Sequence, residues 1–344
     1  MLLRKLKTAA LALASGAVLM AGTATADAQT LRMASLGQAS PTTVFSIALS
    51  QAMKKDYGYS TQLATGSPAT RQAVEAAMQQ LDLFVTAVSI NSYLKNGTRM
   101  YEKMDNAPEL FSELRSIVNY PLGAYHGIAW ADTGINSMAD MKGKKVFVGP
   151  PSSAGRTVIL QVIKGVTGYE PDKDFTPVNL DWASAEQAFQ DRQVDVYFVP
   201  TPIPSAELQQ LSALGEFRVL GIPDDKVDSE GVKAASSVPG REFDFLQPGT
   251  YSGQVNEKPV RMVSSIVGLG TNKWMDEEVA YNVTTAVFEN HDALVQAAKW
   301  MSIITIHVNF CRHGEFNCKF CSTKLSNFFV TTRFLFAKLI AWHT

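Results

Sequence analysis

The body of this chain contains no cysteine. The sequence has 344 residues, and its three cysteines, Cys311, Cys318 and Cys321, all lie after residue 310. A disulfide framework is therefore excluded for the body, whose stability must come from a hydrophobic core. Charge of one sign is also missing, because the formal net charge is −1. This balance excludes bulk electrostatic attraction to nucleic acid or to an anionic membrane surface.

Motifs of catalysis are absent as well. The chain has no phosphate-binding loop, no Gly-x-Gly-x-x-Gly and no Ser-His-Asp spacing. The isolated His126 and His291 are more typical of structural or surface histidines than of ligands. Four carboxylates fit solvated helix faces and strand ends better than a catalytic group: Asp181, Glu186, Asp191 and Asp195. These residues predict no catalytic site, no metal and no cofactor.

No apolar run beyond the first residues is long enough to predict a membrane span. The first residues themselves have the features of an export signal. Basic residues precede an apolar run over residues 9–20, and small-residue cleavage sites follow it. The run is short for an anchor, and no lipobox cysteine is present. We therefore expect a signal peptide over residues 1–28 and an exported, soluble product that starts near Asp27 or Gln29.

One segment, residues 144–163, has the pattern of a strand, a tight turn and a helix. Val146 to Val148 is a short β-branched and aromatic run, and the Gly149-Pro150-Pro151 sequence ends it. Ser152 and Ser153 are good N-cap residues for the helix that follows. Such a helix start directs unpaired N–H groups and partial positive charge beyond the strand. Arg156 adds a cation that opposes the helix dipole, so we expect this turn to hold a ligand carboxylate; the alternative is an ordinary corner with a solvated arginine.

The first third of the chain alternates strands and helices. The pattern predicts strands at residues 31–35, 59–64 and 81–87, and helices at residues 44–55 and 69–80. A β-α-β-α-β order predicts a parallel sheet, whose ligand site lies beyond the carboxyl ends of the strands. Residues 37–43, 66–67 and 87–89 should therefore share one edge of the sheet.

A second β-α series follows from about residue 125 to residue 222. The strand at residues 114–118 is expected to end at residues 119–123, where proline and glycine indicate a crossing between domains. Residues 224–255 indicate a long returning loop, and residues 276–300 one long amphipathic helix. We therefore expect two lobes with a cleft between them: residues 29–122 and 245–301 form the first lobe, and residues 123–244 form the second.

Several segments resemble the TAXI family of extracytoplasmic solute receptors, which serve tripartite ATP-independent periplasmic (TRAP) transporters. The resemblance covers about residues 30 to 300. The segments that carry it are residues 131–146, 148–156, 183–188, 193–199 and Gly249-Thr250-Tyr251-Ser252-Gly253-Gln254.

The resemblance implies an α/β, type II periplasmic binding protein fold with two lobes and an inter-lobe ligand cleft. It also implies capture of a small organic anion, a glutamate-like amino acid or a dicarboxylate, and delivery to a TRAP membrane permease without catalysis. The first loop departs from the family pattern, because Thr42 and Thr43 stand where aromatic residues are common. This difference indicates a more polar pocket wall.

The predicted ligand-binding residues come from both lobes. Hydroxyl and backbone N–H groups are expected from the first lobe and from the turn after residue 148 in the second lobe. Arg156 is the expected carboxylate clamp, and two tyrosines are expected to form a wall. The full set is Ser35, Gly37, Ser40, Thr42, Thr43, Ser89, Tyr120, Ser152, Ser153, Arg156, Thr157 and Tyr251.

The tail over residues 302–344 is atypical. It holds all the cysteines and many more basic than acidic residues, which indicates a frameshift or a misplaced gene end. Two other interpretations are a zinc site or disulfide at Cys311 to Cys321, and a membrane-surface helix at residues 328–342. The first fits poorly because the ligand set lacks two clear pairs, and the second because apolar positions do not form one face.

Two rival functions stay open. One is an enzyme on the same two-lobed fold, such as a deaminase-type transferase; such enzymes need a cofactor-bearing cysteine, which the body lacks. The other is a transcriptional effector domain, against which the export signal and the missing DNA-binding helix pair argue.

Overall fold

The computed structural model describes residues 29–305, apart from residues 39 and 152. The strands of this part are β1 (Thr30–Ala34), β2 (Ser60–Ala64), β3 (Phe84–Ala87), β4 (Leu114–Trp130), β5 (Lys145–Phe147), β6 (Thr176–Val178), β7 (Val196–Thr201), β8 (Phe217–Leu220), β9 (Arg241–Leu246) and β10 (Val260–Asn272). Its α-helices are α1 (Pro41–Tyr57), α2 (Ala69–Ala77), α3 (Val88–Asn96), α4 (Ala107–Ser112), α5 (Ala154–Thr167), α6 (Trp182–Gln190), α7 (Ala206–Leu214), α8 (Glu230–Ser236), α9 (Glu277–Glu289) and α10 (His291–Ala297).

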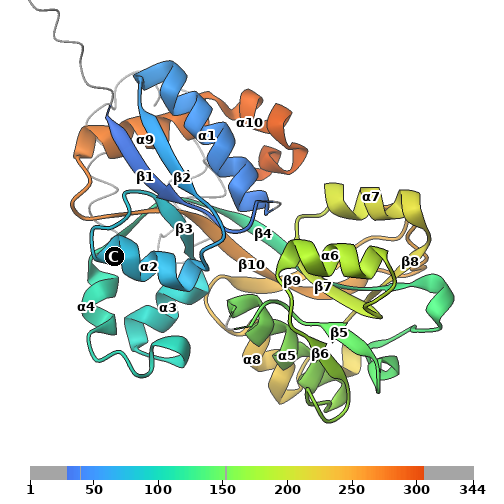
Figure 1. Ribbon diagram of the computed structural model, residues 1–344. Coiled ribbons are helices and arrows are strands. Elements are labelled where there is room, and N and C mark those ends of the chain that lie inside the picture. The colour runs from blue at the N-terminus through green and yellow to red at the C-terminus, as the bar shows by residue number, and fades with distance from the viewer. Residues whose placement is uncertain (1–28, 39, 152, 306–344) are drawn as a thin grey trace, which may run out of the picture.

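The strands form a mixed arrangement. β1 and β2 pair in parallel, and a parallel bridge from Met33 to Leu83 links β1 to β3. The larger sheet has the order β3-β10-β4-β7-β5-β6, with β8 on β4 and β9 on β10. β10 is antiparallel to β3, β4 and β9, whereas β5 is parallel to β6 and β7. Figure 1 shows the long strands β4 and β10 running side by side from one half of the molecule into the other.

β4 corrects the expectation that a strand ends at residues 119–123. β4 continues through this segment and has 17 residues in all. Pro121 lies opposite Ile266, next to an irregularity in the pairing with β10, where a missing N–H is tolerated. Gly123 has a φ of 116°, which a glycine adopts without strain. The proline and glycine therefore bend the strand without ending it.

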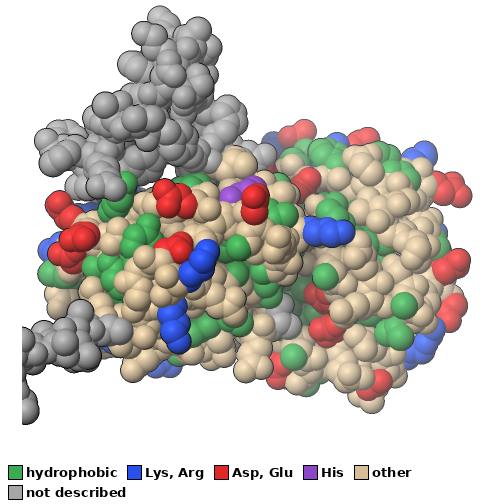
Figure 2. All heavy atoms as spheres, turned by 90° about the horizontal axis from the view of Figure 1, so that it is seen from above, with side chains coloured by type: hydrophobic (Ala, Val, Ile, Leu, Met, Phe, Trp, Pro, Cys, Tyr) green, Lys and Arg blue, Asp and Glu red, His purple; other side chains and the backbone are tan. Residues whose placement is uncertain are grey.

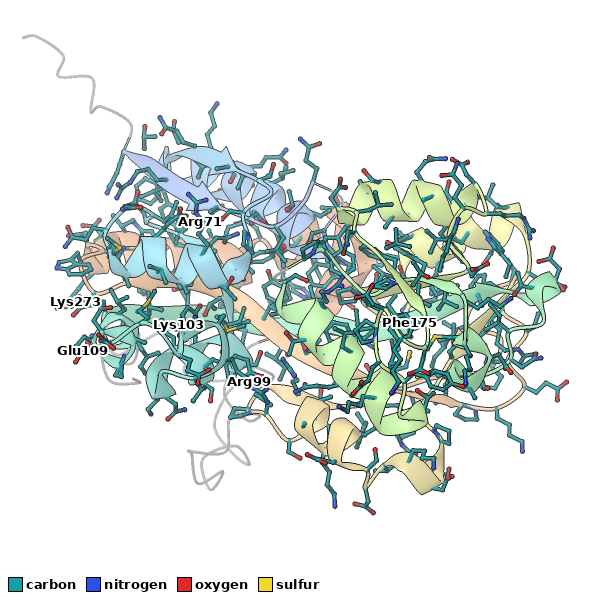
Figure 3. All side chains as sticks on the ribbon, turned by 60° about the horizontal axis from the view of Figure 1, so that its bottom comes forward. Arg71, Arg99, Lys103, Glu109, Phe175 and Lys273 are labelled. Carbon is teal, nitrogen blue, oxygen red and sulfur yellow. The ribbon has the colours of Figure 1, made fainter. Side chains whose placement is uncertain are left out.

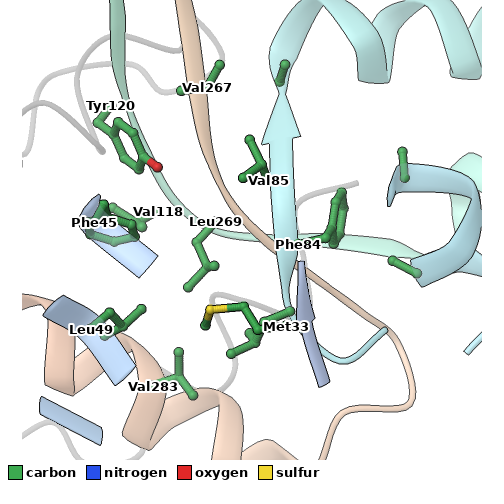
Figure 4. Close-up of a cluster of buried hydrophobic side chains, with 14 of the residues drawn as sticks. Met33, Phe45, Leu49, Phe84, Val85, Val118, Tyr120, Val267, Leu269 and Val283 are labelled. Atoms are coloured by element: carbon green, nitrogen blue, oxygen red, sulfur yellow. The ribbon is translucent and has the colours of Figure 1, made fainter. Parts of the chain in front are cut away.

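The first half of the molecule packs around one hydrophobic cluster. Met33 of β1, Phe45 and Leu49 of α1 and Leu269 of β10 meet there, and all are fully or almost fully buried (Figure 4). α9 closes the cluster with Val283, also buried. The cluster thus joins the first strands and helices to elements that are more than 200 residues later in the chain.

Two further clusters fill the other half, one on each face of the strands β4, β5 and β7. On one face Tyr125 and Phe198 pack with Ile159 of α5. On the other face Tyr197 packs with Phe189 of α6 and Leu208 of α7. This sandwich of helices on both faces of a sheet is the α/β architecture that the alternating pattern predicts.

Residues 224–255 contain regular structure, which corrects the expectation of a long loop. Ser229 accepts a hydrogen bond from the Val232 N–H and so caps α8. Gly231 then lets α8 approach α5 closely, since a Cβ there would lie 2.4 Å from the Gln161 carbonyl oxygen. β9 follows and pairs with six residues of β10. The polar composition reflects surface exposure and does not indicate missing structure.

The helix expected over residues 276–300 is divided in two. α9 ends at Glu289, and α10 begins at His291. Between them the Asn290 side chain donates to the Asp56 carboxylate and to the Ala286 carbonyl, which stabilises a non-helical backbone there. Among the described residues, none of the helices is long and apolar enough to cross a membrane.

Charged side chains are distributed over the surface. Acidic and basic groups alternate on the face in Figure 2. In the first half, the exposed Arg71 lies on α2, Lys103 lies just before α4, and Glu109 lies on α4 (Figure 3). Arg71 pairs with Glu75 at 2.7 Å. Interspersed signs of this kind agree with the near-zero net charge and favour no polyanionic partner.

Candidate functional site

A cluster of buried hydroxyl groups lies where β1 leads into α1. Ser35, Thr42 and Thr43 are almost fully buried. The Thr43 hydroxyl donates to the Ser35 hydroxyl at 3.0 Å, and the Ser35 hydroxyl donates to Thr42 at 3.3 Å. The Ser40 hydroxyl lies 2.9 Å from that of Thr42, and the Gly37 carbonyl accepts from Thr43. The structure thus brings together all five residues predicted in this loop, chiefly in contact with one another.

The three corners expected at one edge do lie side by side. β1 is parallel to both β2 and the start of β3, so the carboxyl ends of the three strands meet. The Gly66 N–H donates to the Leu36 carbonyl and joins two of the corners. Ser89, 5% exposed, lies in the first turn of α3, directly after β3.

The turn between β5 and α5 is closed on itself. The Ser153 hydroxyl accepts from the Arg156 N–H at 3.1 Å and caps the helix, as the sequence predicts. The Arg156 guanidinium donates to the Gly149 carbonyl at 3.1 Å, so one of its donors holds the turn. Thr157 is half-buried in the same turn of helix. Ser152 lies outside the described residues.

Helix capping differs between the two halves. The helices that follow β5, β6 and β7 are capped by the side chains of Ser153, Asp181 and Ser205. The helices that follow β1, β2 and β3 have no side-chain cap. At α1 and α2 part of the first-turn capacity is used within the backbone, because the Thr43 N–H donates to the Ser40 carbonyl and the Arg71 N–H to the Pro68 carbonyl. The remaining first-turn amides have no side-chain partner and attract negative charge. The edge of the first half is therefore the better electrostatic match for an anion.

The two halves meet at the start of α5. Ala154, the first residue of that helix, packs against the hydrophobic cluster of the first half, and so does Val238 after α8. A Cβ on Gly155 would lie 3.6 Å from the Tyr125 ring and 3.5 Å from Trp182. The turn between β5 and α5 thus faces the first half, with the Tyr125 and Trp182 rings of its own half beside it.

Sequence reasoning missed the pair formed by Tyr125 and Ser265. The Ser265 hydroxyl donates to the Tyr125 hydroxyl at 3.3 Å, between β10 and β4. Both side chains are buried and lie where these strands pass between the halves. The two residues are 140 positions apart in the chain, and no local pattern links them. Only the register of β4 and β10 brings them together.

The two tyrosines predicted as a pocket wall lie in hydrophobic cores. The Tyr120 ring is 1% exposed and lies 4.8 Å from the Phe45 ring, and burial raises the pKa of its hydroxyl. Tyr251 packs against Phe217, and its hydroxyl accepts from the Ser205 N–H at 2.8 Å. Burial raises the pKa of Tyr251 to about 12. Packing accounts for both rings, and a ligand contact for either stays a prediction.

The predictions for the two ends of the chain concern residues that the structure does not describe. The expected signal peptide, the possible zinc site or disulfide and the possible membrane-surface helix all lie outside the described residues. Within the part that the structure describes, no three histidine, cysteine, aspartate or glutamate side chains are grouped so that they could hold a metal ion.

Several solved structures of binding proteins are similar to this chain, one of them with a TM-score above 0.5. The binding-protein component of a phosphonate ABC transporter from Pseudomonas aeruginosa matches with a TM-score of 0.51 and 14% identity over 81% of each chain. The periplasmic aliphatic sulphonate binding protein SsuA from Escherichia coli has a TM-score of 0.45 and 15% identity over 80% of this chain and 73% of its own. A TRAP periplasmic solute binding protein from Desulfovibrio desulfuricans, with bound sn-glycerol-3-phosphate, has a TM-score of 0.45 and 12% identity over 80% and 79%.

The curled mixed sheet and the first of these matches confirm the predicted α/β fold of periplasmic binding proteins. At the level of sequence, residues 43–310 match the NMT1-like family. This match spans most of the chain, including all but the first two residues of α1 and every later strand and helix that the structure describes. The chain therefore belongs to the NMT1-like family.

Proposed function

We propose that this protein is a periplasmic solute-binding receptor that captures a small organic anion between its two halves. The observation that carries the proposal is the contact of Ala154 with the first hydrophobic cluster. Ala154 is the first residue of α5, so this contact supports a position of the β5–α5 turn, with Arg156, near the first half, whose helices α1 and α3 have no side-chain cap. Cationic and N–H groups contributed by both halves would match a ligand that carries negative charge.

The finer assignment follows the resemblance to the TAXI receptors. The proposed ligand is a glutamate-like amino acid or a dicarboxylate, and the proposed partner is a TRAP-type membrane permease. The phosphonate-binding neighbour also takes an organic anion, which supports this class of ligand. We propose binding rather than catalysis, with residues 1–28 as the signal peptide.

The two halves are proposed to be the two lobes of the receptor. Their separate hydrophobic clusters support a division near residue 122, since Leu122 packs in the first cluster and Ala124 in the third. Residues 245–301 are the predicted return to the first lobe, but Leu246 to Val263 pack with the second half, and Val267 is the first later residue that packs with the first. Closure of the lobes over the anion would stabilise the state that a permease recognises. All twelve predicted site residues remain in the proposed binding surface. Among those that the structure describes, Ser35 and Thr42 are the least exposed, followed by Thr43, Tyr120 and Tyr251.

Thermal unfolding of the mature full chain with organic acids and amino acids tests this function. A ligand present at a hundred times its dissociation constant should stabilise the protein by roughly 2.7 kcal/mol. We expect stabilisation by at least one dicarboxylate or acidic amino acid and none by neutral sugars. An unchanged melting temperature with every acid and amino acid would contradict the proposal.

Arg156→Ala tests the β5–α5 turn. A charge-assisted hydrogen bond contributes about 1.5–3 kcal/mol, so loss of Arg156 should weaken calorimetric affinity about 10- to 100-fold. Lys164→Ala is the matched control, because Lys164 is a cation at the far end of the same helix, where it pairs with Glu170. Equal affinity of the wild type and Arg156→Ala would remove Arg156 from the site.

A further inference from the structure

A buried arginine without a counter-charge lies between the two halves. Arg241, the first residue of β9, is 9% exposed. One guanidinium nitrogen, Nη1, donates to the Ala235 carbonyl at 3.0 Å, at the end of α8. Its Nε–H has no hydrogen-bond partner in the part of the chain that the structure describes.

No carboxylate of the described residues forms an ion pair with Arg241. By contrast, the more exposed Arg32, Arg192 and Arg261 all pair with aspartates. A guanidinium is always charged and has five N–H donors in a planar fork. Burying such a group without a partner costs several kcal/mol of folding free energy. Proteins retain a buried charge of this kind mainly where an anion compensates it.

Two hydroxyl groups share the face of the sheet on which Arg241 lies. Arg241 is directly opposite Ser265 in the antiparallel pairing of β9 with β10, and directly opposite residues project to the same face. Ser265 in turn donates to the Tyr125 hydroxyl. Because that hydroxyl accepts from Ser265, its own proton is available to another acceptor. β9, β10 and β4 thus contribute one cation and two hydroxyls.

Helix starts from both halves lie beside this group. A Cβ on Gly240, the residue before Arg241, would lie 2.4 Å from the Val88 Cβ at the start of α3. α3 has nine residues and no side-chain cap. The start of α5 lies over Tyr125, as the 3.6 Å approach of Gly155 shows. Each helix start adds partial positive charge to the surroundings of Arg241.

We infer that Arg241, Ser265 and Tyr125 form the oxyanion subsite of this protein, with the guanidinium as the main charge partner of the ligand. The inference rests on the proposed binding function and identifies the group that recognises the ligand's negative charge. Arg156, whose guanidinium already holds the Gly149 carbonyl, is then the outer, secondary cation. A carboxylate, phosphonate or sulfonate group meets the chemistry of this subsite, since each offers two or more oxygens to the guanidinium fork.

The test compares Arg241→Gln with Arg261→Gln in the mature full chain. Arg261 is on β10, four residues from Ser265, but pairs with Asp224. Calorimetry with L-glutamate, succinate, methylphosphonate and methanesulfonate, and with the amides glutamine and succinamate, gives the affinities. We expect Arg241→Gln to weaken binding of the preferred anion about 10- to 100-fold and to abolish its preference over the amide. Arg261→Gln should bind as the wild type does.

The melting temperature of Arg241→Gln without ligand distinguishes the subsite from a purely structural role of Arg241. Without ligand, Arg241→Gln should melt at least as high as the wild type, because an unpaired buried charge is removed. A lower melting temperature together with unchanged affinity would overturn the inference. If Arg241→Gln does not fold, the variants Ser265→Ala and Tyr125→Phe test the subsite. Each should bind the anion several-fold more weakly than the wild type, and unchanged affinity in both would overturn the subsite.

Failure of the proposed function is distinguishable from failure of the subsite. If the wild type binds an acid and Arg241→Gln binds it equally well, the receptor function stands and the subsite is wrong. If no organic acid binds the wild type, the receptor function is contradicted, and sulfate is the remaining probe. At equal ionic strength, sulfate should raise the melting temperature of the wild type more than chloride does, and Arg241→Gln should lose this difference; that result supports the subsite. Equal sulfate-induced shifts of the melting temperature in the wild type and in Arg241→Gln overturn it.

Discussion

Single buried polar residues give this protein much of its expected response to pH. His126 of β4 is fully buried, and its Nδ1 lies 2.8 Å from the Ala124 carbonyl oxygen. Its Nε2 has no partner among the described residues. Burial lowers the pKa of His126 to about 4. The folded protein therefore holds this histidine neutral at a pH where the unfolded chain protonates it.

We predict that His126 makes the protein less stable as the pH falls from about 6.5 to about 4. In this window the unfolded state binds one proton more than the folded state, so the free energy of unfolding decreases by up to about 3 kcal/mol. In His126→Gln this contribution should vanish, as measured by urea unfolding at pH 7, 5 and 4. His291→Gln, at a half-exposed position, is the control. Parallel pH profiles of wild type and His126→Gln would refute the assignment.

Among the elements, the bent strand β4 depends on one glycine. A Cβ on Gly123 would lie 2.1 Å from the Thr201 carbonyl oxygen, and this oxygen belongs to the neighbouring strand β7. The backbone there cannot move without loss of sheet hydrogen bonds. Gly123 thus permits both the positive φ and the close approach of β4 to β7 in the region that joins the two halves.

Gly123→Ala should therefore destabilise the protein by more than 3 kcal/mol, through both the left-handed backbone and the clash. Gly134→Ala separates the two effects. Gly134 has a φ of 73° and nothing within 4 Å of an added Cβ, so only the backbone cost of about 1–2 kcal/mol is expected. Chemical denaturation of both variants gives the difference. Similar losses in the two would mean that β4 can shift away from Thr201.

At the scale of the whole molecule, two buried groups act in opposite directions. Burial, together with the nearby Glu186 carboxylate, raises the pKa of Glu207 in α7 to about 7. Between its ordinary value of 4.5 and about 7, the folded state keeps a proton that the unfolded state has lost. The contribution of Glu207 to stability is complete below pH 4.5 and is lost as the pH rises through 7.

The contributions of His126 and Glu207 should thus largely cancel between pH 4.5 and 6.5. We predict that Glu207→Gln becomes more stable as the pH rises in this window, and that His126→Gln becomes less stable. The wild type should change less than either, as measured by urea unfolding at pH 4.5 and 6.5. Above pH 7, the free energy of unfolding of Glu207→Gln should exceed that of the wild type by on the order of 3 kcal/mol. If the wild type and both variants showed parallel pH profiles, the pKa of neither the Glu207 carboxyl nor the His126 imidazole would be shifted by folding.

Much of the fold could be predicted because its elements have local signals. The strand pattern before Gly149 and the cap at Ser153 both appear as expected. Errors occurred where a neighbour overrides the local signal. Pro121 and Gly123 indicate an end to the strand, but pairing with β10 and β7 carries it through. The long helix at residues 276–300 is interrupted by hydrogen bonds of Asn290, one of them to Asp56 in α1.

The sequence by itself determined the α/β class, the order of the elements from β1 to β3 and from β5 to β8, and the hydroxyl-rich loops that follow the strands. Each of these depends on periodicity, turn residues and caps within a few positions. Only the tertiary structure decided that Arg241 is buried without a carboxylate and that Ser265 and Tyr125 lie beside it. Tyr125 is on β4, far in the chain from Arg241 on β9 and Ser265 on β10. The register between the three strands, which no local pattern encodes, sets which side chains become neighbours.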